Sequence, residues 1–187
     1  MAHPDHIDGW WFSAGRVLPN GDGRPIKLGC THHVNGRIMP CINGLNLSVN
    51  ALDALSYSTG DIVWRVRGHG TVVVERNKAA CSDRTYLRGG IDVSDVVRHF
   101  ARLCALDVIS LWDAPDEVRT YLRTGDPTIS AEAMAAACFA AGAAVWVATR
   151  DAAARDAAGD AIWARQNRRL HRMLMDAIRK DERKRMK

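Results

Sequence analysis

The sequence lacks an apolar run of the about 18 to 20 residues that a membrane-spanning helix needs. Its first residues, Met1 to His6, carry neither the basic nor the apolar segment of a secretory signal, so we expect no signal peptide. A nucleophile elbow, a Walker loop and a dinucleotide-binding fingerprint are also missing. Together these absences favour a cytoplasmic protein without a cofactor, and they argue against an enzyme.

Paired cysteine motifs are missing as well. The five cysteines are an odd number and lie far apart, which predicts reduced thiols rather than a disulfide framework. Only Cys30, His32, His33 and Cys41 are close enough in the sequence to suggest zinc. Because consecutive residues of a strand point to opposite faces, His32 and His33 are not expected to bind one ion. We therefore predict no metal site.

What the chain does contain is typical of a folded protein. Its 187 residues are 47% hydrophobic and 25% charged, enough for one domain of ordinary size or two small ones. The alternation of apolar residues over Ile62–Val66 predicts a strand, Asn35-Gly36 predicts a type I′ hairpin, and Gly68-His69-Gly70 predicts a hairpin tip. We expect a β-rich domain with hairpins over residues 1–92.

The hydrophobic period changes to a helical one near Val93. Residues 131–164 hold 17 alanines, and alanine is the best helix former. We expect either one long helix there or, preferably, two helices that break near Thr149–Asp151 and bury Trp146 and Trp163. An apolar stripe with three- and four-residue spacing continues to Ile178. The sequence thus predicts an α+β protein with a helical domain over residues 93–187, ending in a long basic helix.

Positive charge is concentrated at the C-terminus. Residues 165–187 hold ten basic and three acidic side chains, a net charge of +7, whereas residues 1–164 carry 16 basic and 18 acidic side chains, a net charge of −2. Such a cluster attracts acidic proteins or nucleic acids, although cations also stabilise the C-terminus of a helix. We predict these partner-binding residues: Arg165, Arg168, Arg169, Arg172, Arg179 and Lys180.

A second cationic group lies between the predicted hairpin and the helices. Residues 77–88 combine polar, hydroxyl and cationic side chains in a segment that we predict to be an irregular loop. Lys78, Arg84 and Arg88 are the candidates for an anion-binding site in this loop.

Several motifs resemble a family of uncharacterised phage and prophage proteins, in which a small α+β domain precedes an alanine- and tryptophan-rich helical tail. The motifs are Leu52-Asp53-Ala54-Leu55, Gly60-x-Ile62-Val63, Phe100-Ala101-Arg102, Leu111-Trp112-Asp113-Ala114-Pro115 and Thr124-Gly125-Asp126. Members of the family often carry a histidine at the position of Asn46. Because an amide does not titrate usefully, Asn46 is not expected to act as a base.

The resemblance implies an accessory protein of a phage that binds a host protein or ribonucleoprotein. Our leading hypothesis is a non-enzymatic inhibitor of a bacterial defence system, similar to an anti-CRISPR protein. Three alternatives stay open. One is a nucleic-acid-binding protein that uses the tail together with Arg65, Arg67 and Arg88. The second is an enzyme of the ADP-ribosyltransferase type built around residues 78–88, and the third is a purely structural or virion role. The oligomeric state stays open too, since alanine-rich helices also suit dimers.

Overall fold

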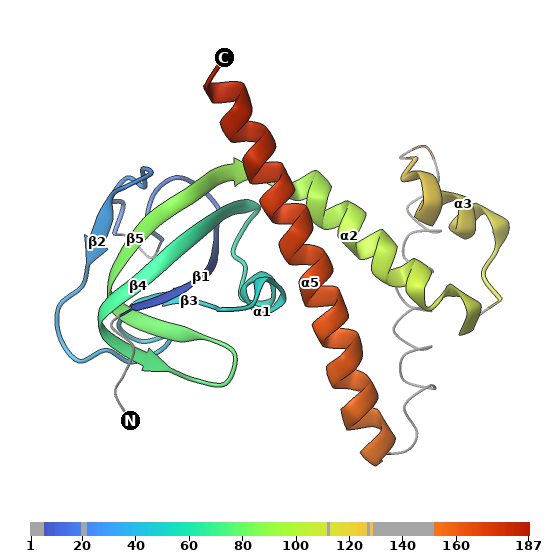
Figure 1. The fold of residues 1–187 in the computed structure, drawn as a ribbon, viewed down its shortest axis with the longest axis horizontal. Helices are drawn as coiled ribbons and strands as arrows, with labels where there is room; N and C mark the ends of the chain where they lie inside the picture. Colours follow the sequence, from blue (N-terminus) through green and yellow to red (C-terminus); the bar gives the residue numbers. More distant parts are fainter. Residues whose placement is uncertain (1–5, 20–21, 112, 127, 129–151) are drawn as a thin grey trace. The chain divides into compact units, whose positions relative to one another are not determined.

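The computed structural model describes residues 6–19, 22–111, 113–126, 128 and 152–187 (Figure 1). Within these residues, the strands lie in the first half of the chain and most helices in the second, which confirms the predicted α+β class. The strands are β1 (His6–Ser13), β2 (Thr31–His33), β3 (Leu45–Leu47), β4 (Ile62–Val74) and β5 (Ala79–Asp92). The helices are α1 (Ala51–Ser56), α2 (Ser94–Asp107), a 3₁₀ helix (Ile109–Leu111), α3 (Asp116–Thr124) and α5 (Ala152–Arg185).

The chain divides into two compact units. One comprises Met1–Ser94 together with Leu170–Lys187, and the other comprises Asp95–Arg169. The first division lies close to the domain boundary that we predicted after residue 92. The end of the basic helix, however, belongs with the sheet and not with the preceding helices. We call these the sheet unit and the helical unit.

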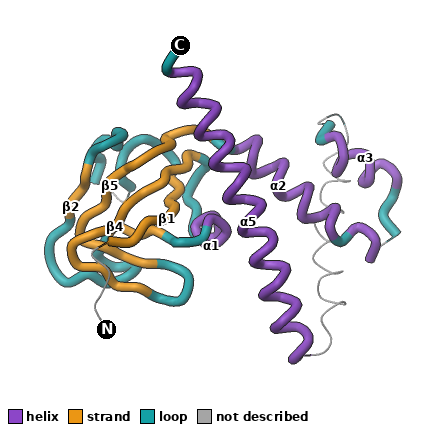
Figure 2. Tube along the Cα trace, in the orientation of Figure 1, coloured by secondary structure: helices purple, strands orange, loops and turns teal. Residues whose placement is uncertain are grey.

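The sheet of the first unit is antiparallel. Its order is β1-β4-β5-β2, and β3 pairs with β5 as well (Figure 2). β4 and β5 form a long hairpin whose turn is closed by a hydrogen bond from the Glu75 amide to the Lys78 carbonyl. The hairpin tip predicted at residues 68–70 is therefore wrong, because these residues lie inside β4. Gly68 is needed for packing, since a Cβ there would lie 2.8 Å from Leu47 Cδ2.

The hairpin predicted around Asn35-Gly36 is wrong as well. β2 pairs with β5, with Thr31 opposite Thr85, and the residues after Gly36 form only an isolated bridge between Met39 and Asn43. β5 is 14 residues long, so one of its edges pairs with both β2 and β3. The segment after Gly36 is held by side-chain hydrogen bonds in place of a second strand. Asn43 Nδ2 donates to the backbone carbonyls of residues 35 and 37.

Aromatic side chains form much of the core of the sheet unit. Trp64 is 2% exposed, packs edge-on against Tyr86 with ring centroids 5.3 Å apart, and donates its indole N–H to Ser13 Oγ at 3.0 Å. Trp64 and Val66 are both buried, which confirms the alternation predicted for this strand. Val63 has no exposed surface either, so the alternation holds only from Trp64 onward.

The C-terminal part of α5 completes the sheet unit. Leu170, Leu174 and Ile178 have no exposed surface, which confirms this part of the predicted stripe. The ring of His171 packs edge-on against Trp10 with centroids 5.3 Å apart, and Glu182 accepts a hydrogen bond from Arg88 Nε at 2.7 Å. The helix is thus held to the sheet by both apolar and polar contacts.

The helical unit contains α2, α3 and α5 as far as Arg169. Val118 and Leu122 of α3 are buried, and Gly125 ends this helix in the left-handed conformation. Trp163, expected in a core, is 37% exposed. Trp146, which was expected to be buried together with Trp163, lies outside the described residues. The same is true of the helix break predicted near residues 149–151.

None of the described helices is long and apolar enough to cross a membrane.

Burial separates the cysteines of the sheet unit into two kinds. Cys81 on β5 is fully buried, and burial raises its pKa to about 11, whereas Cys41 is exposed. Because the thiolate is the reactive form, we expect iodoacetamide at pH 7.5 to modify Cys41 and to leave Cys81 unmodified in the native protein. Peptide mass spectrometry measures both, with the urea-unfolded chain as the control. Equal labelling of the two thiols in the native protein would contradict the burial of Cys81.

Candidate functional site: the cationic face of the C-terminal helix

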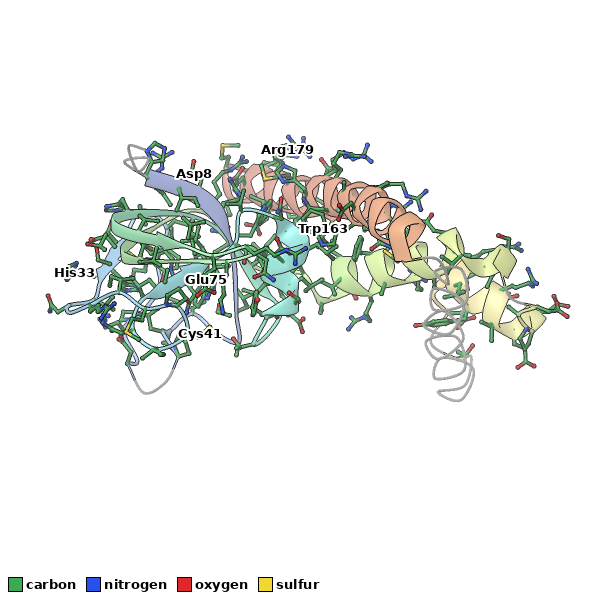
Figure 3. All side chains as sticks on the ribbon, turned by 90° about the horizontal axis from the view of Figure 1, so that it is seen from below. Asp8, His33, Cys41, Glu75, Trp163 and Arg179 are labelled. Atoms are coloured by element: carbon green, nitrogen blue, oxygen red, sulfur yellow. The ribbon has the colours of Figure 1, made fainter. Side chains whose placement is uncertain are left out.

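The exposed side of α5 in the sheet unit carries a row of cations. An α-helix turns about 100° per residue, so the side chains at positions 172, 179, 180 and 183 point about 120 to 180° away from Leu174. All four are exposed (Figure 3 labels Arg179). We call this set, Arg172, Arg179, Lys180 and Arg183, the cationic face. Because the opposite side of the helix is buried, the backbone that carries these side chains is held in place.

Few carboxylates compensate this charge. Residues 170–187 hold seven basic and three acidic side chains, a net charge of +4. Asp176 pairs with Arg179, Asp181 pairs with Arg185, and Glu182 pairs with Arg88. Among the described residues, Arg172, Lys180 and Arg183 have no acidic partner within ion-pair distance. Three of the four cations of the cationic face are therefore exposed without a carboxylate partner in the part of the chain that the structure describes, and Arg179 is exposed but paired.

The other predicted partner-binding residues belong to the helical unit, and two of them are already paired. Arg165 Nη2 lies 3.1 Å from Asp107 Oδ2, and Arg169 Nη1 lies 2.9 Å from the same oxygen. The hydrogen bond to Asp107 raises the pKa of Arg169. Only Arg168 of these three is exposed without an acidic partner among the described residues. Partner binding by Arg165 and Arg169 therefore stays a prediction, and both side chains already have an acidic partner in Asp107, which is distant in the sequence.

The three candidates for an anion-binding loop do not come together. Residues 79–92 form strand β5, which is paired on both sides, so the predicted irregular loop is wrong. Lys78 lies 3.3 Å from Glu75 Oε2, and Arg88 is paired with Glu182. Arg84 alone has its side chain inside the unit, with 2% exposure. Its environment is described below.

The residues considered for zinc lie apart. His32 is buried and faces Tyr86, whereas His33 is exposed and donates to Asp83 at 2.7 Å, so the two rings point to opposite faces as expected. Burial lowers the pKa of His32, and the hydrogen bond to Asp83 raises the pKa of His33. Within the described residues, no group of three or more His, Cys, Asp or Glu side chains is placed to hold a metal ion.

Sequence reasoning missed an aromatic cavity of about 210 Å³ in the sheet unit. Trp10, Trp11, Phe12 and Tyr57 contribute to its walls, together with Lys78. The Lys78 ammonium lies 5.3 Å from the centre of the Tyr57 ring, within the range of a cation–π interaction. The run Trp10-Trp11-Phe12 was the available signal, because successive side chains of a strand point to opposite faces and three consecutive rings cannot all pack in one core.

No protein-family model matches this chain, and no curated protein or solved structure matches it significantly. The resemblance to phage proteins accordingly stays a prediction from the sequence motifs.

Proposed function

We propose that this chain is a phage or prophage accessory protein that binds an acidic surface of a host protein or ribonucleoprotein through the cationic face, and that it inhibits a bacterial defence system in the manner of an anti-CRISPR protein. Such a protein acts in the cytoplasm of the host. The observation that carries the proposal is the row of solvent-directed cations on a helix whose other side is buried. The phage-like motifs of the sequence supply the biological setting.

The cationic face suits recognition of carboxylates and phosphates. Arginine offers a planar fork of N–H donors that remains charged at any physiological pH. From Arg172 to Arg183 the helix rises about 16 Å, at about 1.5 Å per residue, so the face can span several acidic groups of a partner. Because Leu170, Leu174 and Ile178 are buried, little ordering of the backbone is needed when the partner binds.

An acidic protein surface is favoured over a bare nucleic acid by the placement of the sheet arginines. Arg67 donates two hydrogen bonds to Asp8, at 2.6 and 2.9 Å, and Arg88 is paired with Glu182. Arg65 lies over the ring of Trp10, 4.7 Å from its centre, and burial lowers its pKa. These side chains are engaged within the unit, so they do not extend the cationic face into the long phosphate-binding stripe of a nucleic-acid protein.

The enzyme hypothesis has less support. It required the cations of residues 78–88 to surround an anionic cofactor. Lys78 and Arg88 are each held by a glutamate, and Arg84 is inside the unit. The residues proposed to bind that cofactor therefore do not converge.

Charge reversal tests the proposed function. We expect the double variant Arg172→Glu/Arg183→Glu to weaken binding to the partner by about tenfold or more, equivalent to about 1.4 kcal/mol, because two attractive contacts become repulsive. The readout in cells is phage plating on bacteria that carry a CRISPR effector or another defence system, with the protein expressed from a plasmid. Wild-type protein should restore plating, and the double variant should not.

The matched control is Arg37→Glu/Arg123→Glu, which changes the net charge equally at two exposed arginines away from the cationic face. It should restore plating as the wild type does. Affinity capture of the wild type, with and without nuclease, separates protein partners from nucleic acids. Two results contradict the proposal: equal plating with the double variant and the wild type, or no restoration of plating in any defence-positive strain. Capture that is lost with nuclease would favour the nucleic-acid alternative.

A further inference from the structure

Arg84 of β5 is a charged side chain in the interior of the sheet unit. Its guanidinium lies 3.9 Å from the ring centre of Trp11 and 5.1 Å from that of Tyr86, so it is enclosed by two aromatic rings. Nη1 donates to the Asn46 carbonyl at 2.6 Å, and Nη2 and Nε donate to the Tyr86 hydroxyl at 2.8 and 3.3 Å. These contacts fix both the position and the plane of the guanidinium.

None of these acceptors carries a negative charge. The Tyr86 hydroxyl also lies 3.0 Å from His32 Nδ1, while His32 Nε2 lies 3.2 Å from the Pro25 carbonyl. In the arrangement that satisfies every group, His32 Nε2–H donates to Pro25 and the Tyr86 hydroxyl donates to Nδ1. Tyr86 is thus a neutral phenol, and burial raises its pKa further from neutrality.

Two carboxylates of this region, Asp22 in the cavity lining and Asp83 next to Arg84 in the chain, have other partners. Asp22 is held by two hydrogen bonds from Arg24, each 2.7 Å long, and the hydrogen bonding to Arg24 lowers the pKa of Asp22 to about 2. Asp83 accepts hydrogen bonds from His33 and Ser82. No acidic side chain of the described residues pairs with Arg84, so its positive charge is buried and uncompensated.

Such a charge is costly to the folded protein. Moving an ion out of water costs several kcal/mol even after relaxation, and arginine does not escape the cost by losing its proton. Burial lowers the pKa of Arg84, but the free guanidinium pKa is so high that the group stays charged. A methionine would fill the same aromatic slot without this penalty.

The Arg84 guanidinium also has N–H groups without an acceptor among the described residues, and a cavity lies beside it. Arginine carries five N–H groups, and three of those of Arg84 have the acceptors named above, which leaves one on Nη1 and one on Nη2. A cavity of about 240 Å³ reaches Arg84, and Trp11, Asn43 and Asn46 also line it. Asp22 lines this cavity too, but its carboxylate is compensated by the ion pair with Arg24. Cavities for drug-sized ligands start near about 300 Å³, so the occupant that fits here is small.

We propose that this cavity is a binding site for a small oxyanion, a carboxylate or a phosphate, whose charge compensates Arg84. The two remaining N–H groups bind its oxygens, and the ring of Trp11 covers the guanidinium from one side. Charge-assisted hydrogen bonds of this kind are about twice as strong as neutral ones. The site is independent of the cationic face, so either proposal can fail without the other.

The direct test is a titration of the full chain, labelled with ¹⁵N, with sodium phosphate and, separately, with sodium acetate at constant ionic strength. Sodium chloride alone is the reference. We expect a saturable change in the Arg84 Nε–H signal with at least one oxyanion, accompanied by a rise in melting temperature. A response to phosphate alone identifies a phosphate site, and a response to acetate alone identifies a carboxylate site.

Variants assign the effect to the guanidinium. Arg84→Lys keeps the charge but loses the fork, so we expect at least about tenfold weaker binding, and Arg84→Met should abolish it. Arg37→Met, at an exposed arginine, is the matched control and should bind as the wild type does. If Arg84→Met fails to fold, the wild-type titration and Arg84→Lys still decide. The proposal is overturned if neither oxyanion gives a saturable change up to about 10 mM, or if Arg84→Lys binds as tightly as the wild type.

Discussion

Replacing Trp64 with alanine is expected to lower the free energy of unfolding of the sheet unit by about 3 to 5 kcal/mol. The indole is almost fully buried, touches the Tyr86 ring edge-on, and donates to Ser13 Oγ. Truncation removes the largest side chain of β4, leaves a cavity in the sheet core, and deprives the buried Ser13 hydroxyl of its donor. Hydrogen exchange of β4 and β5 peptides in increasing urea measures the loss.

The matched control is Trp163→Ala, which removes an indole that is 37% exposed and belongs to the helical unit. We expect a change of less than about 1 kcal/mol, the range of most surface substitutions. If both variants lowered the protection of β4 and β5 equally, the central position of Trp64 in the core would be wrong.

Replacing Leu174 with alanine is expected to cost about 2 to 5 kcal/mol and to loosen residues 170–187 from the sheet unit. Leu174 is fully buried between Leu170 and Ile178, one helical turn away on either side. The ion pair from Glu182 to Arg88 is partly exposed, and such pairs contribute little, so it cannot replace the lost apolar contact.

Hydrogen exchange of peptides from residues 170–187 reports this loosening. Amides there should exchange at least about tenfold faster in Leu174→Ala, because even 2 kcal/mol exceeds the 1.4 kcal/mol of a tenfold change. Met186→Ala, at a side chain that is 79% exposed, serves as the control and should not change exchange at the buried turn. Wild-type protection in Leu174→Ala would show that these residues do not depend on that contact.

Local patterns in the sequence were good predictors where the cause of structure is itself local. The spacing of Leu170, Leu174 and Ile178 indicated the buried side of α5, since helical periodicity needs no information from elsewhere in the chain. A glycine commonly ends a helix because the left-handed conformation favours it, and Gly125 ends α3 in this way with a φ of 73°. The exposure of Arg172, Arg179 and Lys180 followed from the same stripe.

Patterns that depend on distant partners misled the prediction. Residues 79–92 are rich in polar and small side chains and have weak strand signals, yet they form the central strand because β4 pairs on one side and β2 and β3 on the other. Asn35-Gly36 has the residues of a hairpin turn, but its strand partner is β5. Gly68 and Gly70 resembled a turn, whereas crowding by neighbouring side chains excludes a Cβ at both positions inside β4.

The candidate sites divide in the same way. Composition alone located the positive charge at the C-terminus, because charge is a property of the residues present. Which cations are paired was decided by carboxylates far away in the sequence, as Asp107 is for Arg165 and Arg169, and Glu182 is for Arg88. The burial of Arg84 was also invisible in the sequence, since it depends on the Trp11 ring of β1 and the Asn46 carbonyl of β3, which are distant in the chain, as well as on Tyr86 of its own strand.

The amino-acid sequence by itself determined the α+β class, the apolar side of the last helix and the excess of cations at the C-terminus, because helix period, capping and charge act over a few residues. Tertiary structure decided the strand pairing, the assignment of residues 170–187 to the sheet unit, the pairing of some arginines and the enclosure of Arg84. Those features are set by hydrogen bonds and desolvation between segments that are distant in the chain, and no local pattern encodes them.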